Sequence, residues 1–395
     1  MADPAAPPAQ AGGAWYSRMV PRDPREPHRA ATPLELLFDL CFVVAVAFAA
    51  ADLHHALSED HIADGVAAYP MVFFGIWWAW MNFTWFATAY DTDDVPYRVA
   101  TLVQITGALI LAAGVPRAFE EGDFGIVTLG YAVMRVALAA QWVRAGLGED
   151  GPGRRTAFRY AGGITALMLG WTALLWAPEG IRVPLFLVLV LLELAVPLWA
   201  ERGHRTSWHA GHIAERYGLF TIIVLGETIL SATTAIQTAL AEGEASAAVL
   251  LVAVAGAVIV FALWWLYFAR SAHHFLTSNR VSFVWGYGHF VIFAAAAAVG
   301  AGLAVKVDYH THHSALTAGR ASAAVAIPVA VLLLSMWALH VRPHRTGRLH
   351  DLAYPAGAAL VLLTPLTGAL SLVLIAVVLA GLVAICTATG PARTG

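Results

Sequence analysis

The 395-residue sequence is poor in charged residues and in cysteine. Charged side chains make up 12% of it, against roughly 25% in typical soluble proteins. The net charge of -3 provides no basic field for nucleic acid. Cys41 and Cys386 both lie in apolar stretches, which excludes a disulfide framework and a cysteine-rich metal site. Hydrophobic residues instead make up 59% of the chain, and the mean hydropathy is +0.68. A water-soluble fold could not bury this much apolar surface, so the composition predicts an all-α integral membrane protein.

Apolar runs long enough to cross a bilayer recur along the chain, since a hydrocarbon core of about 30 Å needs roughly 20 helical residues. We expect about twelve transmembrane helices, near residues 34–53, 66–89, 97–115, 125–144, 157–176, 183–200, 214–238, 246–269, 282–305, 316–340, 352–366 and 368–387. Only a short segment around Pro365 separates the last two, which could form one re-entrant pair. Residues 1–31 lack the apolar core of a signal peptide, so we expect a disordered tail there.

The basic residues indicate how these helices are oriented. If the N-terminus is cytoplasmic, the predicted inner segments hold all of the 23 basic residues except Arg117, Arg135, Arg182, Lys306 and Arg320. This distribution follows the positive-inside rule. We therefore expect a multi-pass protein of the cell (inner) membrane, with the lipid bilayer as its partner and both termini in the cytoplasm.

The sequence also suggests an internal repeat. Three features recur at offsets of 187, 182 and 185 residues, namely Trp77-Trp78 with Trp264-Trp265, Leu37-Phe38 with Leu219-Phe220, and Arg135 with Arg320. Near-equal offsets predict two six-helix halves in parallel orientation, at residues 32–200 and 201–390. Chance matching between aromatic-rich helices is the alternative.

Three polar motifs accompany the apolar runs. The first is Thr32-Pro33-Leu34-Glu35-Leu36-Leu37-Phe38-Asp39-Leu40, the second spans residues 215–227, and the third is the helix of Trp77 and Trp78 that ends in Asp91-Thr92-Asp93-Asp94. The motif residues are Glu35, Phe38, Asp39, Asp91, Asp93, Asp94, Glu215, Arg216, Gly218, Gly226 and Glu227. Together the motifs resemble those of the bacterial low temperature requirement A proteins, over residues 32 to about 270. The resemblance implies a membrane protein linked to growth in the cold, and it leaves the molecular activity open.

Ionisable side chains inside predicted spans cost roughly 2.5–3.5 kcal/mol each, so each needs a reason. Glu227 follows Arg216 by eleven residues, which places it about 16 Å deeper on the same helical face. Glu193 and Arg135 fall at a similar depth. We expect the two acids and Arg135 to share a buried cluster. It would be either a structural salt bridge or part of a solute pathway.

The first motif contains two acids with different expected roles. Thr32-Pro33-Leu34-Glu35 has the pattern of a capping box with proline at the first helical position. Asp39 lies one turn deeper, beyond the reach of the helix dipole, and so needs a partner. On the second motif, Glu215 suits the first turn of a helix, and Gly226 permits a close backbone approach or a local break.

Histidines gather in two predicted outer segments. They are His54, His55 and His61 in the first, and His310, His312 and His313, with Asp308, in the second. Such clusters can bind a transition metal or respond to pH, but neither has tight ligand spacing, and we predict no metal site. His212 and His289 could relay protons, although a packing role is the simpler interpretation.

An enzymatic interpretation rests on Asp91-Thr92-Asp93-Asp94, which resembles a magnesium–diphosphate site of membrane prenyltransferases. The repeat-equivalent stretch, residues 276–279, has no acid to face it, and an ion pair with Arg98 is expected instead. Zinc-protease, serine-hydrolase and nucleotide-binding motifs do not occur. We therefore predict a protein that is not an enzyme and needs no cofactor.

These features together predict a secondary transporter or channel for a small ion or polar solute. Its pathway would contain Asp39, Arg135, Glu193, Arg216 and Glu227. The alternatives are a non-transporting membrane factor that responds to bilayer state in the cold, and an intramembrane enzyme with a metal–diphosphate site at Asp91–Asp94.

Overall fold

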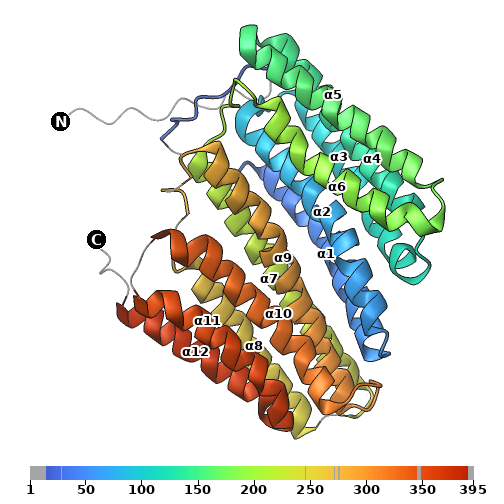
Figure 1. Cartoon of the computed structure of the whole chain (residues 1–395), viewed down its shortest axis with the longest axis vertical. Coiled ribbons are helices and arrows are strands. Elements are labelled where there is room, and N and C mark those ends of the chain that lie inside the picture. The colour runs from blue at the N-terminus through green and yellow to red at the C-terminus, as the bar shows by residue number, and fades with distance from the viewer. Residues whose placement is uncertain are drawn as a thin grey trace. The chain divides into compact units, whose positions relative to one another are not determined.

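The computed structural model describes residues 15–389, except 28, 245, 271, 275 and 345–347. This described part of the chain is all-helical (Figure 1). Its α-helices are α1 (Pro33–Ser58), α2 (Ile62–Tyr90), α3 (Val95–Glu120), α4 (Gly125–Gly148), α5 (Gly151–Leu174), α6 (Glu179–Ala200), α7 (Ala210–Ala241), α8 (Ala247–Phe268), α9 (Asn279–His310), α10 (Ala318–Met336), α11 (Arg348–Leu363) and α12 (Ser371–Thr389). The prediction of an all-α protein is confirmed.

Ten helical segments within the described residues are long and apolar enough to cross a membrane. The helix α5, which begins with three arginines in its first nine residues, is not one of them. The last segment, Arg348–Ala388, contains both α11 and α12. These lengths and compositions are those of a multi-pass membrane protein.

The expected interruption near Pro365 is present. A 3₁₀ segment, Thr364–Leu370, separates α11 from α12, and Gly368 within it has a φ of 61°. Only glycine adopts such a backbone conformation freely, so this residue allows the chain to reverse. The two helices then pack against each other, as their red ribbons show in Figure 1.

Contacts divide the chain into two compact units. Unit 1 consists of Met1–Glu26, Trp85–Gly107 and Ala132–His209, and unit 2 of Pro27–Thr84, Ala108–Tyr131 and Ala210–Gly395. The boundaries fall inside α2, α3 and α4, so these three helices contribute to both units.

In unit 2, α9 packs against α1, α7 and α10. Two glycines on α9 permit close approaches to its neighbours. A Cβ atom on Gly300 would lie 2.9 Å from the Cα atom of Thr228 on α7, and one on Gly302 would lie 2.2 Å from the carbonyl oxygen of Ala324 on α10. The Thr228 hydroxyl also donates to the Ala296 carbonyl at 2.9 Å. Small residues and one interhelical hydrogen bond therefore hold α7 against α9.

The stretch predicted as a disordered tail, residues 1–31, is described in part. Residues 1–14 and 28 lie outside the described residues. In unit 1, the backbone N–H of Ser17 donates to Asp94 at 2.8 Å, and the Arg18 Nε donates to the Gly148 carbonyl at 2.9 Å. Met19 between them is buried. These residues thus contact the ends of α3 and α4.

Candidate functional site

The first motif begins α1 as the sequence predicts. Thr32 is the N-cap, and its hydroxyl accepts a hydrogen bond from the Glu35 backbone N–H at 3.3 Å. In return, Glu35 Oε2 accepts one from the Thr32 N–H at 2.8 Å. Pro33 occupies the first helical position, where a missing N–H costs nothing. The predicted capping box is confirmed.

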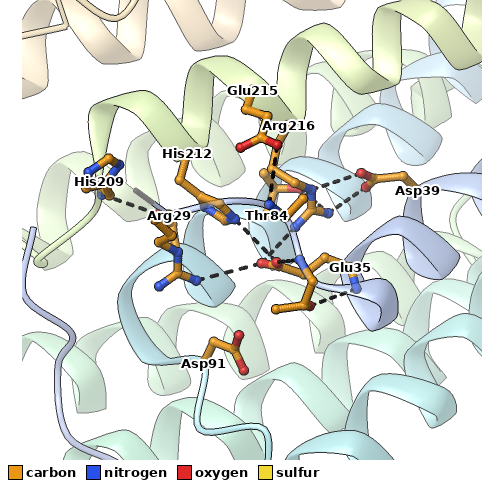
Figure 2. Close-up of polar contacts among 12 residues, drawn as sticks. Arg29, Glu35, Asp39, Thr84, Asp91, His209, His212, Glu215 and Arg216 are labelled. Carbon is orange, nitrogen blue, oxygen red and sulfur yellow. Dashed lines mark hydrogen bonds and ion pairs between the residues drawn. The ribbon is translucent and has the colours of Figure 1, made fainter. Parts of the chain in front are cut away.

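Glu35 also belongs to a buried charge cluster, which capping alone does not explain. Figure 2 shows its carboxylate facing side chains from α7. Arg216 Nη1 lies 3.0 Å from Glu35 Oε1, and His212 Nε2 lies 3.3 Å from Oε2. The Arg29 guanidinium approaches the same carboxylate at 3.9 Å. All four side chains are buried.

Asp39 has the partner that its depth requires. Arg216 donates to it from Nε at 2.9 Å and from Nη2 at 2.5 Å, a two-point contact between α7 and α1 (Figure 2). The Trp80 indole N–H on α2 donates to Asp39 Oδ1 at 2.7 Å, and Arg216 Nη2 lies 3.4 Å from the Thr84 hydroxyl. Asp39 and Arg216 are fully buried. Sequence reasoning identified both residues, but not that they bind each other.

This cluster is a closed arrangement of charges. Arg216 faces two carboxylates, and a second guanidinium, that of Arg29, lies next to Glu35. Taking such charges out of water is costly, and the counter-charges within this cluster offset part of that cost. The cluster consequently joins α1 firmly to α7, and its charges already have counter-charges within the protein.

Glu227 is different. It lies on the buried face of α7, eleven residues beyond Arg216, together with Thr221 and Val224. Its side chain is only 7% exposed, yet within the described part of the chain it has no hydrogen-bond or ion-pair partner. Arg216 and Glu227 thus share one helical face, as their spacing predicts. Arg216 has two carboxylate partners, whereas Glu227 is buried without a counter-charge among the described residues.

The glycines of the second motif have smaller roles than expected. A Cβ atom on Gly226 would meet nothing within 4 Å, and α7 continues past it to Ala241. The suggested close approach or break at Gly226 is therefore wrong. Gly218 is more tightly packed than Gly226, since a Cβ atom there would lie 3.2 Å from the Phe268 ring. The expected place of Glu215 in the first turn is wrong, because it is the sixth residue of α7. Its side chain is exposed and accepts a long hydrogen bond, 3.4 Å, from the Ala31 N–H.

Unit 1 contains a second buried ion pair. Arg135 Nη2 on α4 donates to Glu193 Oε2 on α6 at 2.6 Å, and the Trp171 indole N–H on α5 donates to Glu193 Oε1 at 3.0 Å. The expected contact between Arg135 and Glu193 is confirmed. Glu227 belongs to unit 2, so the predicted three-residue cluster does not form among the described residues of either unit.

The acidic motif between α2 and α3 is tied to arginines. Asp93 accepts hydrogen bonds from Arg98 Nε and Nη2 at 2.8 and 2.7 Å, as predicted. Asp94 accepts from the Tyr97 N–H at 3.0 Å and from both terminal nitrogens of Arg144, with Nη1 at 2.9 Å. Burial raises the pKa of Asp94, but the hydrogen bonds from Arg144 and the two backbone N–H groups outweigh it. The pKa lies below its ordinary value of 3.8.

His54 and His313, one from each predicted outer cluster, have acidic neighbours. His54 Nε2 lies 2.6 Å from Asp308, which also accepts a hydrogen bond from the Ser58 hydroxyl. Among the described residues, one group of three acidic or histidine side chains converges tightly enough to hold an ion; it consists of Glu242, Glu244 and His313 at the protein surface.

Arg135 and Arg320, whose spacing suggests the internal repeat, lie in different environments. Arg320 is the third residue of α10 and pairs with Asp60 at 2.8 Å, with both side chains largely exposed. Arg135 is buried at the eleventh position of α4. The two arginines therefore lie at different depths in their helices.

Comparison with known proteins identifies the family. The model of the bacterial low temperature requirement A protein (LtrA) family matches residues 30–387. An uncharacterized protein of Rhizobium meliloti (strain 1021) is 31% identical over 243 residues, which are 59% of this chain and 57% of that protein. The chain thus spans little more than half the length of this relative. No solved structure matches significantly. The match over most of the chain, together with the three motifs and the helical membrane fold, shows that the protein belongs to the bacterial LtrA family.

Proposed function

We propose that this protein is a secondary transporter or channel for a small ion or polar solute, and that Glu227 is the group that binds the moving ion. The observation that carries this proposal is the setting of Glu227, a carboxyl buried in a candidate membrane span without a partner among the described residues. Ionisable groups inside membrane spans are rare and commonly mark ion and substrate pathways.

The energetics support a mobile counter-charge. An ionised carboxylate without a partner in an apolar interior is far more costly than a paired one. Asp39 and Glu193 have arginine partners within the protein. Glu227 would obtain its counter-charge from outside, as a proton or a small cation that arrives and leaves.

The other proposed pathway residues would then act as a frame. The Arg216–Asp39 contact fixes the face of α7 that carries Glu227, and the Arg135–Glu193 contact fixes α4 to α6. A solute that moved past Glu227 would pass beside rigid helices. In this account Asp39 and Arg216 support the helix face that carries Glu227 without binding the ion themselves, whereas Arg135 and Glu193 stabilise the helix packing of unit 1.

A second candidate is a membrane factor that transports nothing and responds to bilayer state in the cold. The observation that favours it is the pairing of Arg216 with Glu35 and Asp39, since charges that have counter-charges serve helix packing as well as they serve a pathway. This candidate predicts that substitutions of the buried charges lower the amount of folded protein and leave ion flux unchanged.

An enzymatic role is less well supported. Asp93 and Asp94, which would hold a metal–diphosphate group, are engaged by Arg98 and Arg144. We therefore propose that the protein is not an enzyme. We further propose that it crosses the inner membrane twelve times as two parallel six-helix repeats, with both termini in the cytoplasm.

Ion flux into liposomes tests the proposal. The purified protein is reconstituted, and fluxes of protons, Na⁺, K⁺ and small polar solutes are compared for wild type, Glu227→Gln and Glu227→Asp. Glu215→Gln is the matched control, because Glu215 lies on the same helix but is exposed. We expect Glu227→Gln to abolish flux of one ion that Glu227→Asp and Glu215→Gln retain. Unchanged flux in a correctly folded Glu227→Gln protein would contradict the proposal.

A further inference from the structure

We propose that His289, His340 and Tyr267 form a binding site for one transition-metal ion in unit 2. The site is separate from Glu227 and does not depend on the proposed transport function. His289 Nε2 lies 3.0 Å from the Tyr267 hydroxyl and 3.3 Å from His340 Nε2. The three rings are mutual neighbours, with centroid separations of 4.8 to 6.0 Å. All three side chains are buried.

The backbone determines which nitrogen of His289 is free to bind. His289 Nδ1 lies 2.7 Å from the carbonyl oxygen of Trp285, one turn earlier on α9. Two acceptors at that distance would repel each other, so Nδ1 carries the hydrogen and donates it. The lone pair of a neutral His289 is then on Nε2, which points toward His340 and Tyr267. Metal-binding histidines are commonly held in this way, with the second ring nitrogen donating to a backbone carbonyl.

The contacts around Nε2 exceed what a hydrogen-bonded histidine can satisfy. A neutral imidazole has one lone pair on Nε2 and can accept one hydrogen bond there. Two polar atoms, the Tyr267 hydroxyl and His340 Nε2, both approach this nitrogen. A metal ion between the three groups would resolve the conflict, because each of them can direct a lone pair at the ion.

The spacing suits a tetrahedral metal ion. Ligand atoms about 2.0–2.1 Å from zinc lie about 3.3 Å apart in tetrahedral geometry. The two imidazole nitrogens are 3.3 Å apart, and the phenol oxygen is 3.0 Å from one of them. Imidazole nitrogen suits zinc, copper, iron and nickel, whereas magnesium and calcium prefer oxygen ligands. The donor set therefore favours a first-row transition metal such as zinc.

The donors lie on three different helical elements. Tyr267 is the next-to-last residue of α8, and His340 lies in a π-helical turn, Trp337–Val341, at the end of α10. Such turns frequently occur at functional sites. The site thus combines donors from the last turn of α8 and the end of α10 with His289, the eleventh residue of α9. When a divalent ion binds, the Tyr267 O–H bond breaks, the oxygen becomes a ligand, and the proton is released to solvent.

The surroundings of the site are aromatic. Tyr217 from α7 packs against the His289 ring at 4.9 Å, and Trp285 and Phe293 from α9 pack at 4.1 and 5.4 Å. A largely apolar shell strengthens the attraction between the ion and its ligands.

Metal content of the purified protein tests the proposal. The full chain in detergent is loaded with Zn²⁺ or Co²⁺, desalted and analysed for bound metal, and the visible spectrum of the Co²⁺ form is recorded. The variants are His289→Gln, His340→Gln and Tyr267→Phe. His313→Ala is the matched control, because it removes one donor of the surface group formed by Glu242, Glu244 and His313. Glu227→Gln separates this site from the proposed pathway.

We expect one ion per wild-type chain with the spectrum of tetrahedral cobalt. The ion should be lost in both histidine variants, bound more weakly in Tyr267→Phe, and retained in His313→Ala and Glu227→Gln. Thermal unfolding without metal shows which variants are folded, and Tyr267→Phe removes a single oxygen, so at least this variant is expected to stay folded. The proposal is overturned if wild type retains no ion, or if the ion is lost in His313→Ala while folded His340→Gln retains it.

Discussion

Arg216 on α7 holds Asp39 on α1 by two hydrogen bonds, from Nε at 2.9 Å and from Nη2 at 2.5 Å. The two residues are 177 positions apart in the chain, and both are fully buried. The same guanidinium lies 3.0 Å from Glu35, which also caps the start of α1. One arginine therefore joins the first motif of the family to the second.

Removing this arginine should strongly destabilise the protein. Arg216→Ala leaves Asp39 and Glu35 buried without their main counter-charge, and breaking a buried pair in this way costs about 3–5 kcal/mol. Unfolding in detergent measures the loss. Glu215→Gln, an exposed change on the same helix, should alter the free energy of unfolding by less than about 0.5 kcal/mol. Equal stability of the two variants would show that the cluster does not hold α1 to α7.

The packing of α7 on α9 should be sensitive to one added methyl group. Gly300→Ala would place its Cβ 2.9 Å from the Cα atom of Thr228, a backbone atom that cannot move aside, and overpacking of this kind costs about 1–3 kcal/mol. Gly226→Ala is the control, because its Cβ would meet nothing within 4 Å. This control replaces glycine by alanine in a helix interior, so it should raise the free energy of unfolding by about 0.5–1 kcal/mol. Opposite shifts in the unfolding temperature are expected, and a loss in both variants would argue against this helix contact.

The lowered pKa of Asp94 predicts that the free energy of unfolding depends on pH. Its pKa in the folded protein lies below the ordinary value of 3.8, because the hydrogen bonds from Arg144, Ser17 and Tyr97 outweigh burial. The ionised form therefore stabilises the fold above pH 3.8, and this contribution disappears as the pH falls through the lower folded pKa.

The measurement compares wild type with Asp94→Asn in detergent across this range. The difference in free energy of unfolding should be constant near neutral pH and should shrink as the pH falls below about 4. Asp93→Asn, which removes an exposed partner of Arg98, should show a much smaller difference throughout. A difference that grows toward low pH would contradict the assigned contacts.

Local features of the fold could be predicted from the sequence because their causes are local. The capping box at Thr32 and Glu35 depends on residues three positions apart. The contact between Asp93 and Arg98 spans five positions, and the interruption at Gly368 depends on one residue that tolerates a positive φ. Helical periodicity likewise placed Arg216 and Glu227 on one face of α7.

Partnerships between distant helices could not be predicted in this way. Depth in the bilayer indicated that Arg135 and Glu193 lie at one level, and they do meet. The same argument also included Glu227, which lies in the other unit. Every helix that crosses the bilayer has residues at the same depth. Depth therefore identifies candidate partners but does not show which of them are in contact. The pairing of Asp39 with Arg216 depends on how α1 packs on α7. Neither motif alone indicates that packing.

The central claim, that Glu227 exchanges a mobile cation while the paired acids do not, can be tested by chemical labelling. A hydrophobic carbodiimide reacts with protonated carboxyl groups inside membrane proteins and leaves a stable adduct that peptide mass spectrometry locates. The account predicts that Glu227 is labelled, that the transported cation or a higher pH suppresses the labelling, and that Asp39 and Glu193 in the same molecules stay unmodified. Labelling of Glu227 that no cation or pH alters, or no labelling of Glu227 at all, would contradict the account.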